Sequence, residues 1–366
     1  MLERKETAAT PRRTRGPGPT VGDDGIRQIN PLTDPDWEGK IARQRGASFF
    51  HGTNWVRVLH DTYGFRPTYF VEETAGRVGG ILPFMEVDSW LTGRRGISLP
   101  FTDECPPLGA DDRSIRRLVQ AVGAYAAERR WKYWEMRGGT TALGAPAAVA
   151  YHGHAVDLLR PPATIFAQCG GSVRQAVRKA EQAGVTVTFS QSPAALRAFY
   201  GLLCKTRRRH GLPPQPLRFF ENIQRHVLQH GRGCIVLARV QDRPVAGAVF
   251  FHLGPAAIFK FGASDEAFQQ LRANNLVMWR AIEWHARAGF ASLDLGRTSL
   301  DNTGLRRFKR SWGATERRIE YARFDCQTGA FVATPDHSSG RHNRVFRLLP
   351  SAIARLIGAA AYRHIA

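Results

Sequence analysis

The stretch NNLVMWRAIEWHARAGFASLDLGR, residues 274–297, contains a helical pattern that leads directly into a strand pattern. Asn274 or Asn275 can cap the start of the helix, and Gly289 stands just past its end. The apolar positions of the helical pattern are Leu276, Met278, Ile282 and Ala286. From 291 to 296, apolar residues then alternate with polar residues or glycine, which is the period of a strand. We therefore expect a helix that feeds a strand.

The same order of patterns occurs twice in the chain. A strand-turn-strand pattern at 234–253 precedes this helix, and its counterpart at 68–87 precedes a helix and strand at 114–138. The offset is 167 residues between Gly80 and Gly247 and 159 residues between Glu135 and Asp294. Two similar offsets favour an internal duplication. We expect two related α/β modules, residues 26–160 and 161–330, whose sheets face one another across a cleft.

The composition indicates a strongly basic globular protein. With 366 residues, of which 43% are hydrophobic, the chain can fill two domains with buried cores. The formal net charge is +21, which favours anionic partners such as nucleic acid, phosphorylated small molecules or anionic lipid. Charge alone does not choose among these partners.

Both ends of the chain differ from the globular body. Residues 1–25 are rich in Pro, Gly, Thr and Arg, which predicts a disordered basic arm. Residues 331–366 predict a basic amphipathic tail, because 344–366 carries only cations as charges. Its apolar face comprises Leu349, Ile353, Leu356 and Ile357. Such a face suits either an anionic membrane surface or a docking partner.

Features of several protein classes are missing from the sequence. The five cysteines are scattered without CxxC spacing and the twelve histidines show no ligand spacing, so no disulfide framework and no metal site are predicted. The N-terminus lacks the apolar core of a signal peptide, and no run of about 18 apolar residues occurs. We expect a cytoplasmic protein, peripheral on the inner face of the membrane if its tail binds lipid.

The loop FGASDEAFQQLRANN, residues 261–275, is the first candidate binding segment. It delivers a helix N-terminus, whose unpaired N–H groups and positive dipole end suit a phosphate or pyrophosphate. Arg272 stands just before this terminus and adds a full charge. The alternative is that the same residues only cap the helix.

Three segments together carry a family resemblance: FKFGASD (259–265), LRANNLVMWRAIEWHARAGFASLDLGRT (271–298) and GLRRFKRSWGA (304–314). They resemble the FemAB-like branch of the GNAT superfamily, which includes the Fem peptidoglycan peptidyltransferases and pairs two GNAT-like modules in one chain. The resemblance extends over roughly residues 45–325. It implies an α/β (α+β) fold of two tandem GNAT-like modules, with mixed, mainly antiparallel sheets flanked by helices. QQLRANN departs from the GNAT pattern because it has no glycine.

The resemblance also implies a catalytic lysine, and the position of Asp294 in its strand suggests a second catalytic residue. Lys309 matches the lysine of the Fem Phe-Lys segment, and a lysine there could stabilise the oxyanion formed when an amine attacks a carbonyl. Asp294 could orient the amine or act as a general base if burial raises its pKa. The alternative for Asp294 is a structural pairing with Arg297.

Other residues are expected to bind the two substrates. We expect the donor phosphates at Arg272, Asn274, Asn275 and Arg310. We expect substrate contacts at Lys260, Ser264, Arg297 and Trp312, with Phe308 and Trp312 also anchoring the backbone in the core. No metal is expected.

The function implied is N-acyl transfer from acyl-CoA or aminoacyl-tRNA to an amine of a cell-envelope acceptor, such as a peptidoglycan precursor or a polysaccharide or lipid intermediate. The partners would be an anionic small-molecule or lipid-linked substrate and, for the second donor, tRNA. The rival hypothesis is a non-catalytic nucleic-acid-binding protein, which the charge supports. No helix-turn-helix or RNP1 motif accompanies that charge.

Overall fold

The computed structural model describes residues 25–74, 77–109, 111–334, 336, 346–347 and 349–365. The expected basic arm therefore lies outside the described residues up to residue 24, and so does part of the expected tail. None of the helices in the described ranges combines the length and the apolar character that a membrane span requires.

The first half of the chain forms seven strands and three α-helices among the described residues. They are β1 (Ile26–Ile29), α1 (Trp37–Ala42), α2 (Thr53–Tyr63), β2 (Arg66–Thr74), β3 (Arg77–Ser89), β4 (Gly93–Ile97), β5 (Leu108–Gly109), α3 (Asp112–Glu128), β6 (Tyr133–Arg137) and β7 (Val149–Asp157).

The second half repeats this order with additional helices. Its elements are α4 (Pro162–Gln168), α5 (Gly171–Gln182), β8 (Thr186–Ser190), α6 (Pro193–Arg209), α7 (Leu217–His226), β9 (Gly233–Val240), β10 (Arg243–Leu253), β11 (Ala256–Ser264), α8 (Ala273–Arg287), β12 (Ser292–Ser299), α9 (Thr303–Arg310), β13 (Thr315–Asp325), β14 (Ala330–Phe331) and α11 (Ser351–Ala361). The predicted hairpins correspond to β2–β3 and β9–β10, and the predicted helix-to-strand units to α3–β6 and α8–β12.

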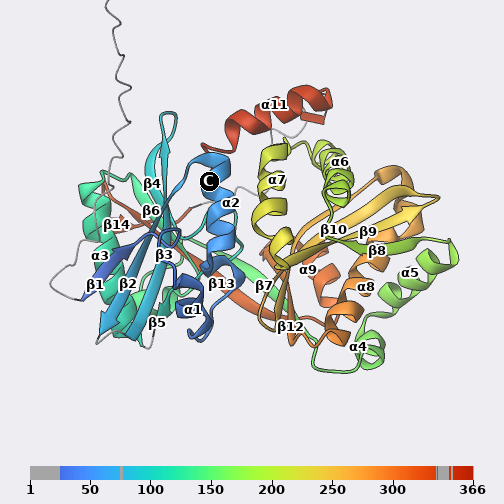
Figure 1. The fold of residues 1–366 in the computed structure, drawn as a ribbon, viewed down its shortest axis with the longest axis horizontal. Coiled ribbons are helices and arrows are strands. Elements are labelled where there is room, and N and C mark those ends of the chain that lie inside the picture. Colours follow the sequence, from blue (N-terminus) through green and yellow to red (C-terminus); the bar gives the residue numbers. More distant parts are fainter. Residues whose placement is uncertain are drawn as a thin grey trace, which may run out of the picture.

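The strands form one continuous mixed sheet (Figure 1). Its order is β1-β2-β3-β4-β6-β13-β7-β12-β11-β10-β9-β8. The pairs β4–β6 and β11–β12 are parallel, and the other pairs among the described strands are antiparallel, as the resemblance implied. The expectation of two sheets facing one another is wrong, because the two halves are hydrogen-bonded side by side.

The two halves exchange their last strands at the middle of this sheet. β7, from the first half of the chain, pairs with β12, whereas β13, from the second half, pairs with β6. β7 and β13 also pair with each other. The sheet order therefore reads the same way from both edges, as a duplication predicts. The module boundary at residue 160 stays a prediction.

The helix predicted around residues 274–288 begins one residue before the expected caps. α8 starts at Ala273, and its N-cap is Arg272, whose backbone adopts the left-handed conformation with φ of 59°. Asn274 and Asn275 therefore lie inside the first turn and do not cap it, which corrects the predicted cap. Glycine adopts this conformation without strain, whereas a residue with a Cβ such as Arg272 adopts it at a cost in conformational energy.

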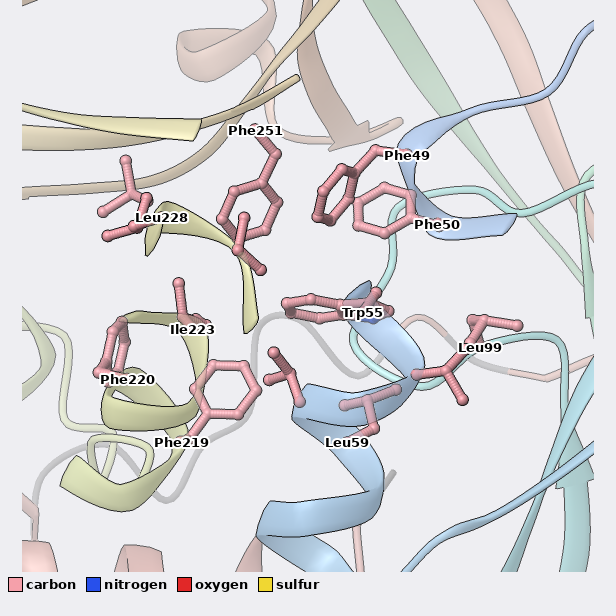
Figure 2. Close-up of a cluster of buried hydrophobic side chains, with 14 of the residues drawn as sticks. Phe49, Phe50, Trp55, Leu59, Leu99, Phe219, Phe220, Ile223, Leu228 and Phe251 are labelled. Atoms are coloured by element: carbon pink, nitrogen blue, oxygen red, sulfur yellow. The ribbon is translucent and has the colours of Figure 1, made fainter. Parts of the chain in front are cut away.

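A shared hydrophobic core joins the two halves (Figure 2). Trp55 on α2 is fully buried and contacts Phe219 of α7 edge-on, with ring centroids 5.6 Å apart. Phe49 stacks on Phe251 of β10 at 4.7 Å. Because these aromatic pairs cross between the halves, neither half can expose this surface without losing substantial apolar burial.

Candidate active site

The parallel strands β11 and β12 separate at the centre of the second half. They pair only where Ala256, Ala257 and Ile258 face Ser292, Leu293 and Asp294. Beyond this point both strands continue, β11 to Ser264 and β12 to Ser299, without pairing to each other. Strands that diverge leave backbone N–H and C=O groups that an extended ligand can bind.

A bulge in β12 coincides with this separation. The pairing of β12 with β7 shifts register between Asp294 and Arg297, and Gly296 within the bulge has φ of 77°. A bulge re-aims the side chains on either side of it, and glycine permits the left-handed backbone that it requires. Asp294 therefore stands at the point of divergence.

Lys309 of α9 is buried directly behind the bulge. Its ammonium Nζ donates hydrogen bonds to the carbonyls of Gly296 (2.9 Å) and Arg297 (2.8 Å), and the residue is only 5% exposed. Burial lowers its pKa to about 8, although Asp103 and Asp294 oppose this shift. An ammonium has three N–H donors, so one remains for a ligand after these two bonds.

The carboxylate of Asp294 lies on the same bulge. Its Oδ1 accepts a hydrogen bond from the Gly296 N–H at 2.6 Å, and its Oδ2 lies 3.6 Å from Arg317. Desolvation raises the pKa of this carboxyl above the ordinary value, although the side chain is still 36% exposed to solvent. A reachable carboxylate with a raised pKa suits a general base.

Arg297 does not form an ion pair with Asp294. The alternative role for Asp294, a structural pairing with Arg297, is therefore not what the structure shows. The Arg297 guanidinium donates to the Tyr321 hydroxyl at 2.6 Å and lies over the Tyr151 ring at 4.3 Å. It also lies 3.8 Å from Asp103.

Lys260 connects this centre to the first half of the chain. Its Nζ donates to the Phe101 carbonyl at 2.6 Å and lies 4.0 Å from Asp103. It also faces the rings of Phe50 and Trp55, 5.2 and 5.5 Å from their centroids. Burial lowers its pKa.

A loop from the first half thus completes the centre of the second half. Residues 98–104 follow β4, and within them Leu99 and Phe101 hold left-handed backbone conformations that are costly for non-glycine residues. This loop contributes Asp103, and it contributes Glu104, which forms an ion pair with Arg317. Sequence reasoning missed these acids because their partners lie about 200 positions away along the chain.

His154 of β7 is a further residue that sequence reasoning missed. It is fully buried, and the nearby Lys309 charge adds to desolvation in lowering its pKa. Within the described chain no group hydrogen-bonds to its ring nitrogens, although Nε2 lies 3.2 Å from a Glu316 oxygen. His154 reaches the site because β7 of the first half pairs with β12 of the second half. The sequence pattern within β7 does not predict this pairing.

The expected donor residues surround the start of α8 and the end of α9. Arg272 and Asn274 are exposed, Asn275 is half-buried, and Arg310 is exposed. No described residue forms an ion pair with Arg272 or Arg310. The neighbouring Arg306 differs, because Glu316 holds it through two hydrogen bonds of 2.8 and 2.7 Å.

Trp312 has a different place from the one expected. It is fully buried in the core of the second half and packs edge-on against Phe308, with centroids 6.0 Å apart. A ring without exposed surface does not touch a substrate, so its expected substrate contact is corrected to the anchoring role. This packing holds α9, and with it Lys309, against β12.

Ser264 lines a basic pocket of about 560 Å³ at the end of β11. The lining residues are Lys205, Arg208, Arg209, Ser264, Asp265, Glu266 and Arg347. Lys205 is paired with Asp265 at 2.6 Å, and the three arginines outnumber the remaining acid, Glu266, so the lining keeps an excess of positive charge. A pocket of this charge suits an anionic group such as a phosphate.

One group in the described chain has ligand atoms close enough for a metal. Atoms of Cys234, His252 and His285 lie within 4.8 Å of one another, on β9, β10 and α8. The two Nε2 atoms are hydrogen-bonded at 2.9 Å, and His285 Nδ1 lies 2.7 Å from the Ala281 carbonyl. Burial lowers the pKa of His252 to about 3 and of His285 to about 4, so a neutral, mutually bonded pair accounts for both rings.

Comparison with solved structures finds the same fold in several proteins. The structure of FemX matches with a TM-score of 0.63 and 13% identity, over 80% of this chain and 96% of FemX. L-PGS from Bacillus licheniformis matches with a TM-score of 0.53 and 16% identity, over 89% and 97%. A tandem GNAT protein from the clavulanic acid biosynthesis pathway matches with 0.52 and 11%, over 82% and 98%. A search of curated protein sequences found no match.

The chain therefore has the fold of the tandem GNAT proteins, as the sequence resemblance implied. More particularly, residues 168–310 match the family described as an acetyltransferase (GNAT) domain. This range contains the separation of β11 and β12 together with Lys260, Asp294 and Lys309.

Proposed function

We propose that this protein is an N-acyltransferase that transfers an acyl group from acyl-CoA or aminoacyl-tRNA to an amine of a cell-envelope acceptor. The observation that carries the proposal is the buried Lys309, with its lowered pKa, held against the β12 bulge where β11 and β12 separate. The GNAT domain match over residues 168–310 supports the same reaction class.

The reaction needs few protein groups. The acceptor amine attacks the donor carbonyl carbon, a C–N bond forms, and the C–S bond of a thioester or the C–O bond of an aminoacyl ester breaks. The third N–H of Lys309 stabilises the oxyanion of the tetrahedral intermediate. Asp294 accepts the proton that the amine loses and passes it to the departing thiolate or alkoxide, which leaves as a thiol or hydroxyl.

The equivalent positions of the first half favour chemistry in the second half alone. Glu135, the counterpart of Asp294, forms ion pairs with Arg137 at 2.9 Å and with Arg323 at 2.5 Å. These cations lower the pKa of Glu135, whereas desolvation raises that of Asp294. A carboxylate locked between two arginines is a poor base, so we assign the first half to completing the site through its 98–104 loop.

Both substrates of the proposed reaction are anionic. The exposed Arg272, the first turn of α8 and Arg310 would hold donor phosphates, and the basic pocket beside Ser264 would hold a phosphate of the acceptor. This assignment fits a peptidoglycan precursor or a polysaccharide or lipid intermediate, and the net charge of +21 also fits tRNA. The protein would then work in the cytoplasm.

The donor can be identified by titrating the purified protein with acetyl-CoA and, separately, with charged tRNA. We expect saturable binding of one donor that survives moderate salt, and acyl transfer to an amine acceptor. The rival hypothesis of a non-catalytic nucleic-acid-binding protein predicts affinity for any polynucleotide that falls steeply with salt, and no acyl transfer from either donor.

A further inference from the structure

An apolar strip is exposed where α11 meets the tip of the β3–β4 hairpin. It comprises Trp90, Leu91, Ile353, Leu356 and Ile365, and Trp90 and Leu356 are 85% and 71% exposed. Figure 1 shows α11 crossing above α2 and α7, on the side of the molecule to which the hairpin between β3 and β4 projects. Isolated exposed apolar residues need no explanation, but a group of large ones marks an interaction surface.

The two segments of the apolar strip are held together. His364 lies 2.8 Å from the Ser89 hydroxyl through its Nδ1, and its ring contacts the Trp90 ring edge-on at 5.6 Å. The buried Arg95 donates to the His364 carbonyl at 2.7 Å. The hairpin tip and the end of the chain therefore form one surface.

The opposite face of α11 packs on the second half of the protein. The Tyr362 hydroxyl donates to the Pro213 carbonyl at 3.1 Å, and Gly358 lies so close to Pro214 that a Cβ would meet its carbonyl oxygen at 2.0 Å. The inward face is thus occupied, while Ile353 and Leu356 point outward. The orientation of α11 is set by its own contacts and leaves the apolar strip uncovered.

The charges around the apolar strip are positive. Arg355 on α11 and Arg363, two residues past the end of this helix, are both exposed. The hairpin's Asp88 is paired with Arg94 at 2.8 Å. Arg208 of the basic pocket donates to the Arg347 carbonyl, so the pocket opens beside the segment that leads into α11.

We propose that the apolar strip docks on an anionic lipid bilayer. An exposed Trp at a hairpin tip and apolar side chains flanked by arginines match the bilayer interface, where aromatic rings sit at headgroup level and arginines reach the phosphates. Docking in this orientation would bring the basic pocket close to the headgroups. The proposal does not depend on acyl transfer.

Co-sedimentation of the full chain with vesicles tests the proposal. One vesicle type is phosphatidylcholine alone and the other also contains phosphatidylglycerol, each at low and at high salt. We expect binding to the anionic vesicles that weakens with salt. The double substitution Trp90→Ala with Leu356→Asp should lower the bound fraction about tenfold, because both side chains enter the interface.

Leu159→Asp is the matched control. Leu159 is 77% exposed, similar to Leu356, but it precedes α4 in the chain. Figure 1 shows α4 at the lower edge of the view and α11 at the upper edge. This variant should bind as the wild type does. Equal binding by the double variant and the wild type would overturn the proposal. So would a wild-type dimer that Leu356→Asp dissociates, since the apolar strip would then join two copies of the chain.

Discussion

The Nζ of Lys309 donates a hydrogen bond to the carbonyl of Gly296 across 2.9 Å, which links helix α9 to the bulge of β12. This contact places a cation whose pKa is lowered to about 8 next to the point where β11 and β12 separate. The proposed catalysis follows from this one relationship, because an oxyanion formed at the bulge would meet the remaining N–H of the lysine.

Turnover should fall as the pH rises through about 8. The oxyanion donor is the protonated lysine, and burial lowers its pKa to about 8, so the active form is lost above that pH. Lys309→Arg should be slower at its optimum, yet it should lack this basic limb because a guanidinium keeps its proton. Initial rates over a pH series for both proteins test this. If the fall in rate at high pH persists unchanged in the arginine variant, then this fall is caused by the titration of a group other than Lys309.

Asp294→Asn should lower turnover about a hundredfold, as expected when a general base is lost. The base must be ionised, and desolvation raises its pKa above the ordinary 3.8, so wild-type turnover should decline as the pH drops through that raised pKa. The variant should show no such acid limb in a pH-rate profile. Retention of both the rate and the limb would exclude Asp294 as the base.

Asp103→Asn should shift the basic limb to a lower pH. Asp103 is the largest influence that raises the pKa of Lys309, and its charge disappears in the amide. Glu104→Gln is the matched control, because Glu104 is the adjacent acid but pairs with Arg317. Its basic limb should stay in place. Identical basic limbs in the Asp103 variant and the wild type would show that the 98–104 loop does not tune the lysine.

Trp55→Ala should destabilise the whole protein by about 3–5 kcal/mol, because it empties a packed position in the core shared by both halves. Since Trp55 contacts Phe219 and Phe251, we expect one unfolding transition that moves as a unit in calorimetry. Trp284→Ala, at a tryptophan that is partly exposed, should cost much less. Two separate transitions in the wild type would contradict a shared core.

Local periodicity was sufficient to predict the repeated units of the fold. The hairpin at 234–253 and the helix and strand at 274–297 appear as β9–β10 and α8–β12, since alternation and helical spacing are properties of neighbouring residues. The exchange of β7 and β13 could not be predicted in this way. It pairs residues more than 130 positions apart, and nothing in either strand's own pattern specifies its partner.

The residues of the candidate site likewise fall into those that the sequence predicted and those that only the fold brings to the site. Lys309 and Asp294 were predicted from two nearby segments, 304–314 and 271–298, and the structure brings both to the same bulge. Asp103 and His154 were missed because they reach the site only through the fold. The expected contact at Trp312 failed because an aromatic residue in a basic segment has the same sequence pattern whether its ring faces a ligand or the core.

The most direct test of the central claim is the turnover of Lys309→Ala with the donor identified by titration and an amine acceptor. We expect a loss of roughly a hundredfold, as for removal of one oxyanion donor, with the circular dichroism spectrum and melting temperature close to those of the wild type. Wild-type turnover in this variant would remove Lys309 from the mechanism and contradict the account of the site.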